Sequence, residues 1–373
     1  MRYAQLSPLL LCAVLAPCGN RLWAAEEPAD PRLVSKAFRA ATAKVLPSLV
    51  TIESYGGVVP APPAPKAKGA PAPRRRMGTI SKPGEGPTTG VILTPDGFII
   101  TSTFNFLRQP PIITVVLHDG SRHVAKLCGR DETRGLCLLK IDGVKGLPVP
   151  AFAPRGELKV GQWVVSMGVG YGGEAPALSA GILSALERFS GKAVQTDANL
   201  SPANYGGPLV DVEGRVVGIA VPLAPGGGAA GEGVQWYDSG IGFAVPLSDA
   251  EPLLARLKAG EVIRPGRLGI QPQPGSAPGG GVIVQDVQKA SAAQKAGIQP
   301  KDVILAIGDK PVRDLLALRV LLGRHVAGDT VSVKLKRGDK EQTVSVTLEA
   351  GDEQIPQPTP LIPDHQPPPP KQP

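Results

Sequence analysis

GVILTPDGFIIT, at residues 90–101, is the stretch of sequence that decides the fold class. Two β-branched runs flank the turn-forming residues Thr94-Pro95-Asp96-Gly97, so the stretch predicts a β-hairpin. Similar short runs, separated by turn residues, recur from Ser48 to Pro246 and predict an all-β barrel or sandwich. The expected strands are Leu49 to Glu53, Gly90 to Leu93, Phe98 to Thr101, Ile113 to Leu117, His123 to Leu127, Leu136 to Ile141, Trp163 to Met167, Leu178 to Leu186, Val194 to Thr196, Pro208 to Val212, Val216 to Val221 and Ile241 to Val245.

Composition agrees with a mainly β protein of two or three domains. The chain has 373 residues, with 46 Gly, 41 Pro and an aromatic fraction of 4%. This balance favours β-rich domains with many turns and makes a helical bundle a poor description. We expect the first domain at residues 33–250.

A second domain is expected at residues 265–350, after a linker helix and hinge at 251–264. The helix begins at its N-cap Ser248 and runs to about Lys258; Gly260 ends it and Pro265 follows. Five or six strands and two helices then predict a small α+β module. The expected strands are Leu268 to Ile270, Val282 to Val287, Val303 to Ile307, Val331 to Lys336 and Thr343 to Leu348, with helices at Ala290 to Ala296 and Asp314 to Arg324.

Three segments are expected to lie outside the folded domains. Residues 1–25 have an apolar core and a small-residue cleavage site, typical of a secretory signal, so the mature protein is expected to be secreted or periplasmic. Residues 56–88 form a Pro/Ala/basic loop, and 351–373 a Pro-rich tail, both expected to be disordered. The loop carries part of the net charge of +8. It either contacts anionic envelope surfaces or is simply solvated; without interleaved aromatic residues it does not indicate nucleic-acid binding.

Cys128 and Cys137 remain after removal of the signal. If their flanking runs pair as a hairpin centred on residues 131–134, the two cysteines lie opposite each other and a disulfide is geometrically feasible. The alternative is two small buried apolar side chains. We expect neither a metal nor a cofactor.

The first domain resembles the HtrA-type (DegP-like) serine proteases. The matching motifs occur in the family's order and spacing, and as a set they are specific. They are Gly90 to Thr101, Leu139 to Ile141, Val160 to Val164, Gln195 to Ala198, Gly206 to Val210 and Gly240 to Pro246. The resemblance implies a chymotrypsin- or trypsin-like double β-barrel.

The second domain is similar to the PDZ domain that follows the protease domain in that family. Its motifs are Leu268-Gly269-Ile270, Ser291-Ala292-Ala293, Ala296-Gly297-Ile298, Asp302-Val303-Ile304 and Gly328 to Val331. PDZ domains hold a terminal carboxylate with backbone N–H groups while the peptide adds as a β-strand. The resemblance implies a peptide-binding site made by Arg267, Leu268, Gly269, Ile270, Leu318 and Leu322. The two helical leucines have an alternative role as core residues.

The catalytic triad of the family is missing from this chain. Phe104 stands at the position of the histidine, Gly135 at that of the aspartate and Tyr205 at that of the serine, while Ala203 replaces the glycine of the oxyanion loop. Serine-type hydrolysis needs a hydroxyl nucleophile, a base and a carboxylate that orients the base. Loss of such a triad lowers turnover on the order of 10⁶-fold. We expect the rings of Phe104 and Tyr205 to be neighbours, with centroids within about 7 Å.

The sequence therefore predicts a catalytically inactive HtrA-like protein that binds unfolded or C-terminal peptide segments in envelope protein quality control. One alternative is a serine-type endopeptidase of altered mechanism. Another is a regulatory partner of an active HtrA protease, in a homo- or hetero-oligomer. HtrA proteases commonly assemble as trimers through their N-terminal region, and residues 34–46 either serve that role here or pack on their own barrel.

Overall fold

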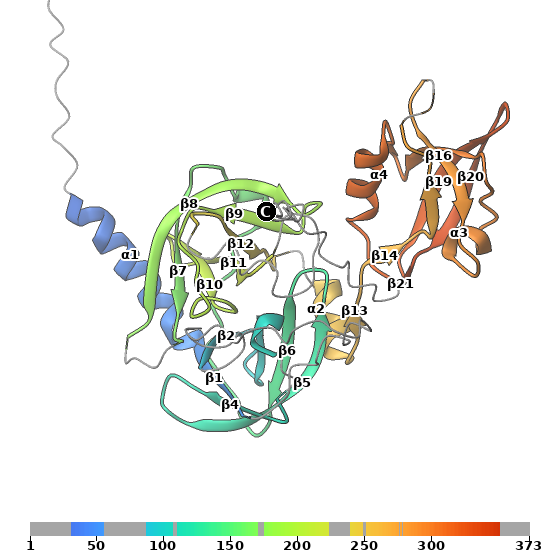
Figure 1. The fold of residues 1–373 in the computed structure, drawn as a ribbon. Coiled ribbons are helices and arrows are strands. Elements are labelled where there is room, and N and C mark those ends of the chain that lie inside the picture. The colour runs from blue at the N-terminus through green and yellow to red at the C-terminus, as the bar shows by residue number, and fades with distance from the viewer. Residues whose placement is uncertain are drawn as a thin grey trace, which may run out of the picture.

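The computed structural model describes residues 31–55, 87–106, 110–170, 175–223, 239–248, 251–275, 277 and 279–350. The expected signal, nearly all of the basic loop and the Pro-rich tail lie outside these residues. The described chain is mainly β, with two barrels followed by a smaller α+β domain (Figure 1). None of its described helices is long and apolar enough to cross a membrane.

The first barrel contains the hairpin that the opening motif predicts. Its strands are β1 (Leu49–Tyr55), β2 (Thr88–Ile92), β3 (Phe98–Ser102), β4 (Ile112–Val116), β5 (Arg122–Asp131) and β6 (Leu136–Ile141). They are ordered β5-β4-β1-β2-β3-β6, and pairing of β5 with β6 closes the ring. The β2–β3 turn is held by hydrogen bonds from Leu93 N to Phe98 O (2.8 Å) and from Gly97 N to Thr94 O (3.1 Å).

The second barrel is also closed. Its strands are β7 (Trp163–Gly168), β8 (Ala177–Arg188), β9 (Ala193–Thr196), β10 (Pro208–Asp211), β11 (Val216–Val221) and β12 (Gly242–Val245). They pair in the order β10-β11-β12-β9-β8-β7. The two barrels together therefore contain all twelve strands expected from the sequence, with ends shifted by a few residues.

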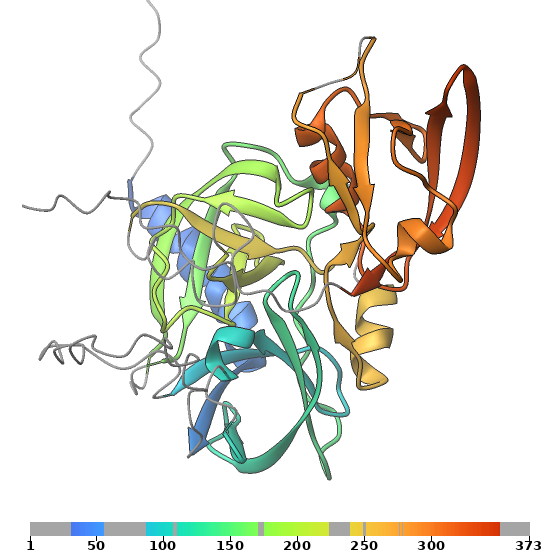
Figure 2. The same ribbon diagram turned by 45° about the vertical axis from the view of Figure 1, so that its right-hand side comes forward.

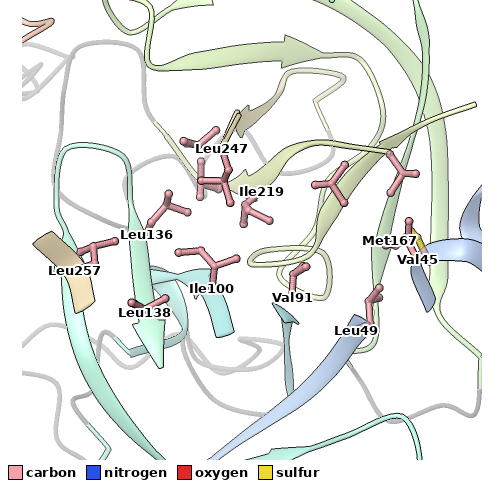
Figure 3. Close-up of a cluster of buried hydrophobic side chains, with 14 of the residues drawn as sticks. Val45, Leu49, Val91, Ile100, Leu136, Leu138, Met167, Ile219, Leu247 and Leu257 are labelled. Carbon is pink, nitrogen blue, oxygen red and sulfur yellow. The ribbon is translucent and has the colours of Figure 1, made fainter. Parts of the chain in front are cut away.

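A shared apolar core joins the two barrels. Figure 3 shows Val91, Ile100 and Leu136 of the first barrel facing Met167 and Ile219 of the second. Helix α1 (Pro31–Val45) and helix α2 (Glu251–Lys258) each add residues to this cluster, Val45 and Leu257 among those that Figure 3 labels. On the outer side, Phe38 of α1 contacts Trp163 edge to face at 5.9 Å between ring centroids. Helix α1 thus packs on the second barrel of the same chain.

The C-terminal domain contains a sheet ordered β15-β16-β17-β19-β20. Its elements are β14 (Gly266–Arg267), β15 (Ile270–Pro272), β16 (Val282–Val287), α3 (Ala292–Lys295), β17 (Val303–Ile307), β18 (Lys310–Pro311), α4 (Leu315–Leu322), β19 (Thr330–Arg337), β20 (Lys340–Thr347) and β21 (Glu349–Ala350). The prediction of one strand from Leu268 to Ile270 is wrong. Gly269 has a φ of +77°, and this left-handed residue turns the chain between β14 and β15.

The C-terminal domain packs directly against the barrels (Figure 2). Strand β13 (Val262–Ile263) pairs with β5, and Val326 joins the core that the barrels share. The amide of Ala327 donates to Arg264 O at 2.9 Å. Helix α4 faces the β8–β9 turn, because a Cβ added at Gly323 would lie 2.5 Å from Ser190 Oγ.

Candidate functional site

The fold brings together, where the two barrels meet, the three positions at which the family resemblance implies a triad. Phe104 lies in the 3-10 helix η2 (Thr103–Phe106), directly after β3. Gly135 directly precedes β6, and its carbonyl accepts a hydrogen bond from Thr103 N at 2.8 Å. Tyr205 lies in the turn before β10, and its ring contacts that of Phe104. The positions implied by the family resemblance are therefore neighbours in space.

Phe104 and Tyr205 fill this place with aromatic carbon. Their ring centroids are 5.3 Å apart and their planes meet at 75°, an edge-to-face contact that confirms the expected proximity. Leu200 and Ala220 complete a small cluster in which no side chain is more than 5% exposed. Such packing gives hydrophobic stabilisation and offers no base or carboxylate to a substrate.

The turn before β10 is closed by Ser201. Its carbonyl accepts hydrogen bonds from Asn204 N (2.8 Å) and Tyr205 N (3.2 Å), and its Oγ accepts one from Ala203 N at 3.3 Å. In trypsin-like proteases the oxyanion is bound by the amide of the nucleophile and the amide two residues earlier. At the equivalent positions here, the amides of Tyr205 and Ala203 both donate within their own turn.

Ala203 carries no backbone strain in this arrangement. It is absent from the described non-glycine residues with positive φ, which are Phe189, Ser190, Ala290 and Lys301. The turn that contains Ala203 is therefore one whose backbone conformation alanine accepts. The sequence did not reveal the role of Ser201, because its effect comes from local hydrogen bonds that many loop serines could make.

Buried polar contacts attach the turn to the first barrel. Thr89 Oγ1 donates to Ala203 O at 2.8 Å, and Thr101 Oγ1 donates to Thr89 O at 2.7 Å. Asn105 Nδ2 donates to Thr101 Oγ1 (2.8 Å) and to Tyr205 O (3.3 Å). Gly206 must be glycine, since its φ is +87° and an added Cβ would lie 2.2 Å from Thr101 Oγ1. Packing and backbone conformation thus require the glycine that follows Tyr205.

The described histidines of the barrels do not form a second catalytic group. His118 is exposed, and His123 Nε2 lies 3.1 Å from Ser121 Oγ in the β4–β5 turn. Asp119 accepts from the hydroxyl of Ser121 at 2.6 Å instead of orienting the imidazole. A catalytic carboxylate would contact the other ring nitrogen of the histidine. These contacts close a surface hairpin.

Cys128 and Cys137 are free thiols and do not form the disulfide that the sequence allowed. A register shift between Leu127 and Gly129 leaves Cys128 in a β-bulge, and Cys137 pairs with Arg130. Burial raises the pKa of the Cys137 thiol to about 12. Cys137 thus behaves as a small core residue, which was the alternative for this position. Among the described residues, no group of His, Cys, Asp or Glu is arranged to hold a metal ion.

The loop from Arg267 to Ile270 precedes an edge strand of the C-terminal sheet. Its carbonyls are used: Gly269 O accepts from Gln288 N at 2.9 Å, and Leu268 O accepts from Ala293 N at 2.8 Å. Within the described chain, neither the amide of Leu268 nor that of Gly269 donates a hydrogen bond. Arg267 is exposed and Ile270 half-buried. Two N–H groups beside a free strand edge suit an incoming carboxylate.

Helix α4 places the two predicted pocket leucines differently. Leu318 is 3% exposed within the domain core, whereas Leu322 is half-buried and packs at its margin. Leu315, which the sequence analysis did not name, is also half-buried and lies about two helical turns before Leu322, on the same side of the helix. Leu315 and Leu322 are therefore partly accessible to solvent, whereas Leu318 is buried in the core of the domain.

The comparisons identify both domains. Residues 88–219 match the trypsin-like peptidase domain, and residues 266–348 match the PDZ domain. Similar curated proteins are the probable periplasmic serine endoproteases DegP-like of Rickettsia prowazekii (30% identical over 270 residues) and Chlamydia trachomatis (33% over 267 residues). Each alignment covers 68% of this chain and 51% or 52% of the relative. The chain thus spans about half the length of the curated relatives it matches.

Solved structures show the same double-barrel and PDZ architecture. An HtrA-type protease AlgW with decapeptide gives a TM-score of 0.61 at 24% identity, covering 84% of this chain and 99% of that protein. A serine endoprotease from Yersinia pestis gives 0.59 at 25% identity, covering 84% and 98%. The likeness extends over both domains and establishes the fold.

Proposed function

We propose a binding function without cleavage for this chain, which belongs to the HtrA-type (DegP-like) family with a trypsin-like peptidase domain and a C-terminal PDZ domain. In this proposal the protein recognises unfolded or C-terminal peptide segments and does not hydrolyse them. Its place is the cell envelope, where it serves protein quality control. The names of the relatives, which are periplasmic endoproteases, support the location.

The observation that carries the proposal is the apolar cluster at the former triad. Phe104 has no basic nitrogen, Gly135 has no side chain, and Tyr205 has a phenol where the family has the hydroxyl of serine. Both rings are nearly inaccessible to solvent. A substrate carbonyl would have to displace this packing before it reached Tyr205, and the amides of Ala203 and Tyr205 would have to leave Ser201.

The PDZ domain supports the binding half of the proposal. Gly269 forms a left-handed turn whose neighbouring amides are available, and β15 lies at the edge of its sheet. Ile270, Leu315 and Leu322 are half-buried apolar side chains on the two elements that flank a peptide in PDZ domains. An apolar C-terminal side chain and a carboxylate are the chemical features that this surface would recognise.

The absence of cleavage is tested with a fluorophosphonate that labels activated serine nucleophiles. We expect no labelling of the mature chain. Labelling that persists in Tyr205→Phe and disappears in Ser201→Ala would identify a new nucleophile and contradict the proposal. Labelling lost in Tyr205→Phe would assign that role to the phenol and contradict it equally.

Peptide binding is tested on the full mature chain with a library of labelled peptides that end in a free carboxylate. We expect binding of peptides with apolar last residues and weaker binding of the same peptides carrying a C-terminal amide, because the amide lacks the charge that the Gly269 loop would hold. If no library member binds, or if the amides bind equally well, carboxylate recognition by this domain is refuted.

A further inference from the structure

The backbone of β15 alternates between two hydrogen-bonding directions. Gly269 O accepts from Gln288 N at 2.9 Å, and Gln273 N donates to Ile283 O at 2.9 Å, so both residues direct these groups toward β16. In an antiparallel pair, every second residue points its N–H and C=O the opposite way. Ile270 and Pro272 therefore present their backbones to the free edge of the sheet.

Proline at an edge position has a direct chemical consequence. Because Pro272 has no N–H, the free edge offers the amide of Ile270 but none two residues later. This is also why the proline is tolerated there, since a proline facing β16 would break the ladder. An added strand pairs with Ile270 through two hydrogen bonds and with Pro272 through one.

The end of the edge strand is closed by a loop. After Pro272 the chain returns to Gly281, whose amide donates to Arg313 O at 3.2 Å, directly before α4. A Cβ added at Gly281 would lie 2.8 Å from Ile304 O, so Gly281 packs closely against β17. The strand available for pairing is thus three residues, or roughly 10 Å, long.

We propose that Pro272 restricts main-chain recognition in this PDZ domain to the C-terminal end of a ligand. The last residue of the peptide pairs fully with Ile270, whereas the carbonyl of the third residue from the end finds no donor. Ligands are then selected by carboxylate and last side chain and gain little from an extended strand. This inference rests on the peptide binding proposed above.

The test combines a protein variant with a backbone-modified probe, on the full mature chain. One probe is fluorescein-labelled Ala-Ala-Ala-Ala-Val with a free carboxylate. In the second, lactic acid replaces the penultimate alanine, so that an ester carbonyl, a weaker acceptor, stands at the third residue from the end. Pro272→Ala supplies the missing N–H, and Pro274→Ala is the matched control, an exposed proline beyond β15.

We expect the native chain and Pro274→Ala to bind both probes within twofold. Pro272→Ala should bind the amide probe about two- to tenfold more tightly and lose that gain with the ester, because one net hydrogen bond is formed and then weakened. If the ester weakens binding to the native chain as much as to Pro272→Ala, the inference is wrong and peptide binding stands. If no protein binds either probe, both this inference and the proposed recognition of apolar C-termini are wrong.

Discussion

The two domains differ in the groups that they present where the family resemblance implies a functional site. The double barrel has an apolar cluster of Phe104, Leu200, Tyr205 and Ala220 at the place where the family resemblance implies a catalytic triad. The PDZ domain has kept a backbone turn at Gly269 beside an edge strand. Hydrolysis at a triad depends on three side chains, so the proposed loss of activity needs only the residues at those three positions to differ. Recognition by main-chain groups survives wide changes in sequence as long as the turn is preserved.

Packing explains why two positions, one in each domain, require glycine. Gly206 lies against Thr101 and Thr89, and Gly269 lies against Ser291, so each is fixed by packing in its own domain. Packing requires glycine at position 206 whichever residue stands at position 205. Gly206 is therefore evidence of the fold and not of catalysis.

The largest expected effect concerns the aromatic cluster. Phe104→Ala should lower the free energy of unfolding of the barrels by about 3–5 kcal/mol, because it leaves a cavity where a ring is 2% exposed. Phe98→Ala removes the same side chain from a half-buried position and should cost less. Urea unfolding followed by far-UV circular dichroism measures both. Equal, small losses would mean that Phe104 is not a core residue and that its ring is accessible to solvent.

A second prediction addresses the PDZ turn. Gly269→Ala combines a left-handed φ with a Cβ only 2.3 Å from Ser291 Cβ, so binding of C-terminal peptides should fall at least about tenfold. Gly275→Ala is the control: its φ is +91°, but an added Cβ would meet nothing within 4 Å. Fluorescence polarisation compares the two variants. Equal effects of both substitutions would exclude a special role for the Gly269 turn.

A third prediction concerns the contact between the domains. Burial, and next the charge of Arg134, lowers the pKa of Lys192 to about 8, against the attraction of Asp131 and Asp329. Between pH 8 and the ordinary value of 10.5, the unfolded chain binds more protons than the folded chain, so this residue makes stability rise with pH. At pH 7 both states are protonated and the full cost of burying the charge remains.

Lys192→Met should therefore stabilise the protein by about 1–2 kcal/mol at pH 7 and flatten the rise between pH 8 and 10.5. Lys126→Met is the control, because its side chain is 77% exposed. Thermal unfolding across that pH range provides the measurement. A Lys192→Met variant that is less stable at pH 7 would show that the ammonium group is held by favourable contacts.

The smallest expected effect is that of reductant. With Cys128 in a bulge and Cys137 opposite Arg130, dithiothreitol should change the free energy of unfolding by less than about 0.5 kcal/mol. A disulfide of this kind would contribute about 2–4 kcal/mol. A large drop in stability on reduction would place the two thiols in a bond and contradict the register of β5 and β6.

The sequence predicted the strands of both barrels because β-branched runs and turn residues alternate regularly from residue 48 to 246. It also predicted the contact of Phe104 with Tyr205, which followed from the family resemblance. The bulge at Cys128 was hidden, because a one-residue register shift leaves no mark on composition. For Leu318 the sequence left two roles open, pocket or core, and the structure places this residue in the core. The hydrogen bonds of Ser201 depend on tertiary packing, which periodicity does not encode.

The central claim is tested most directly by digestion of unfolded casein with the purified mature chain, beside a Phe104→His, Gly135→Asp, Tyr205→Ser, Ala203→Gly revertant. Space exists for the aspartate, since a Cβ at Gly135 meets its nearest neighbour, Thr103 Oγ1, at 3.6 Å, although the φ of +69° adds strain. The account predicts that the native chain leaves casein intact. A revertant that cuts would show that only the side-chain chemistry was lost, and cleavage by the native chain that survives repurification would contradict the account.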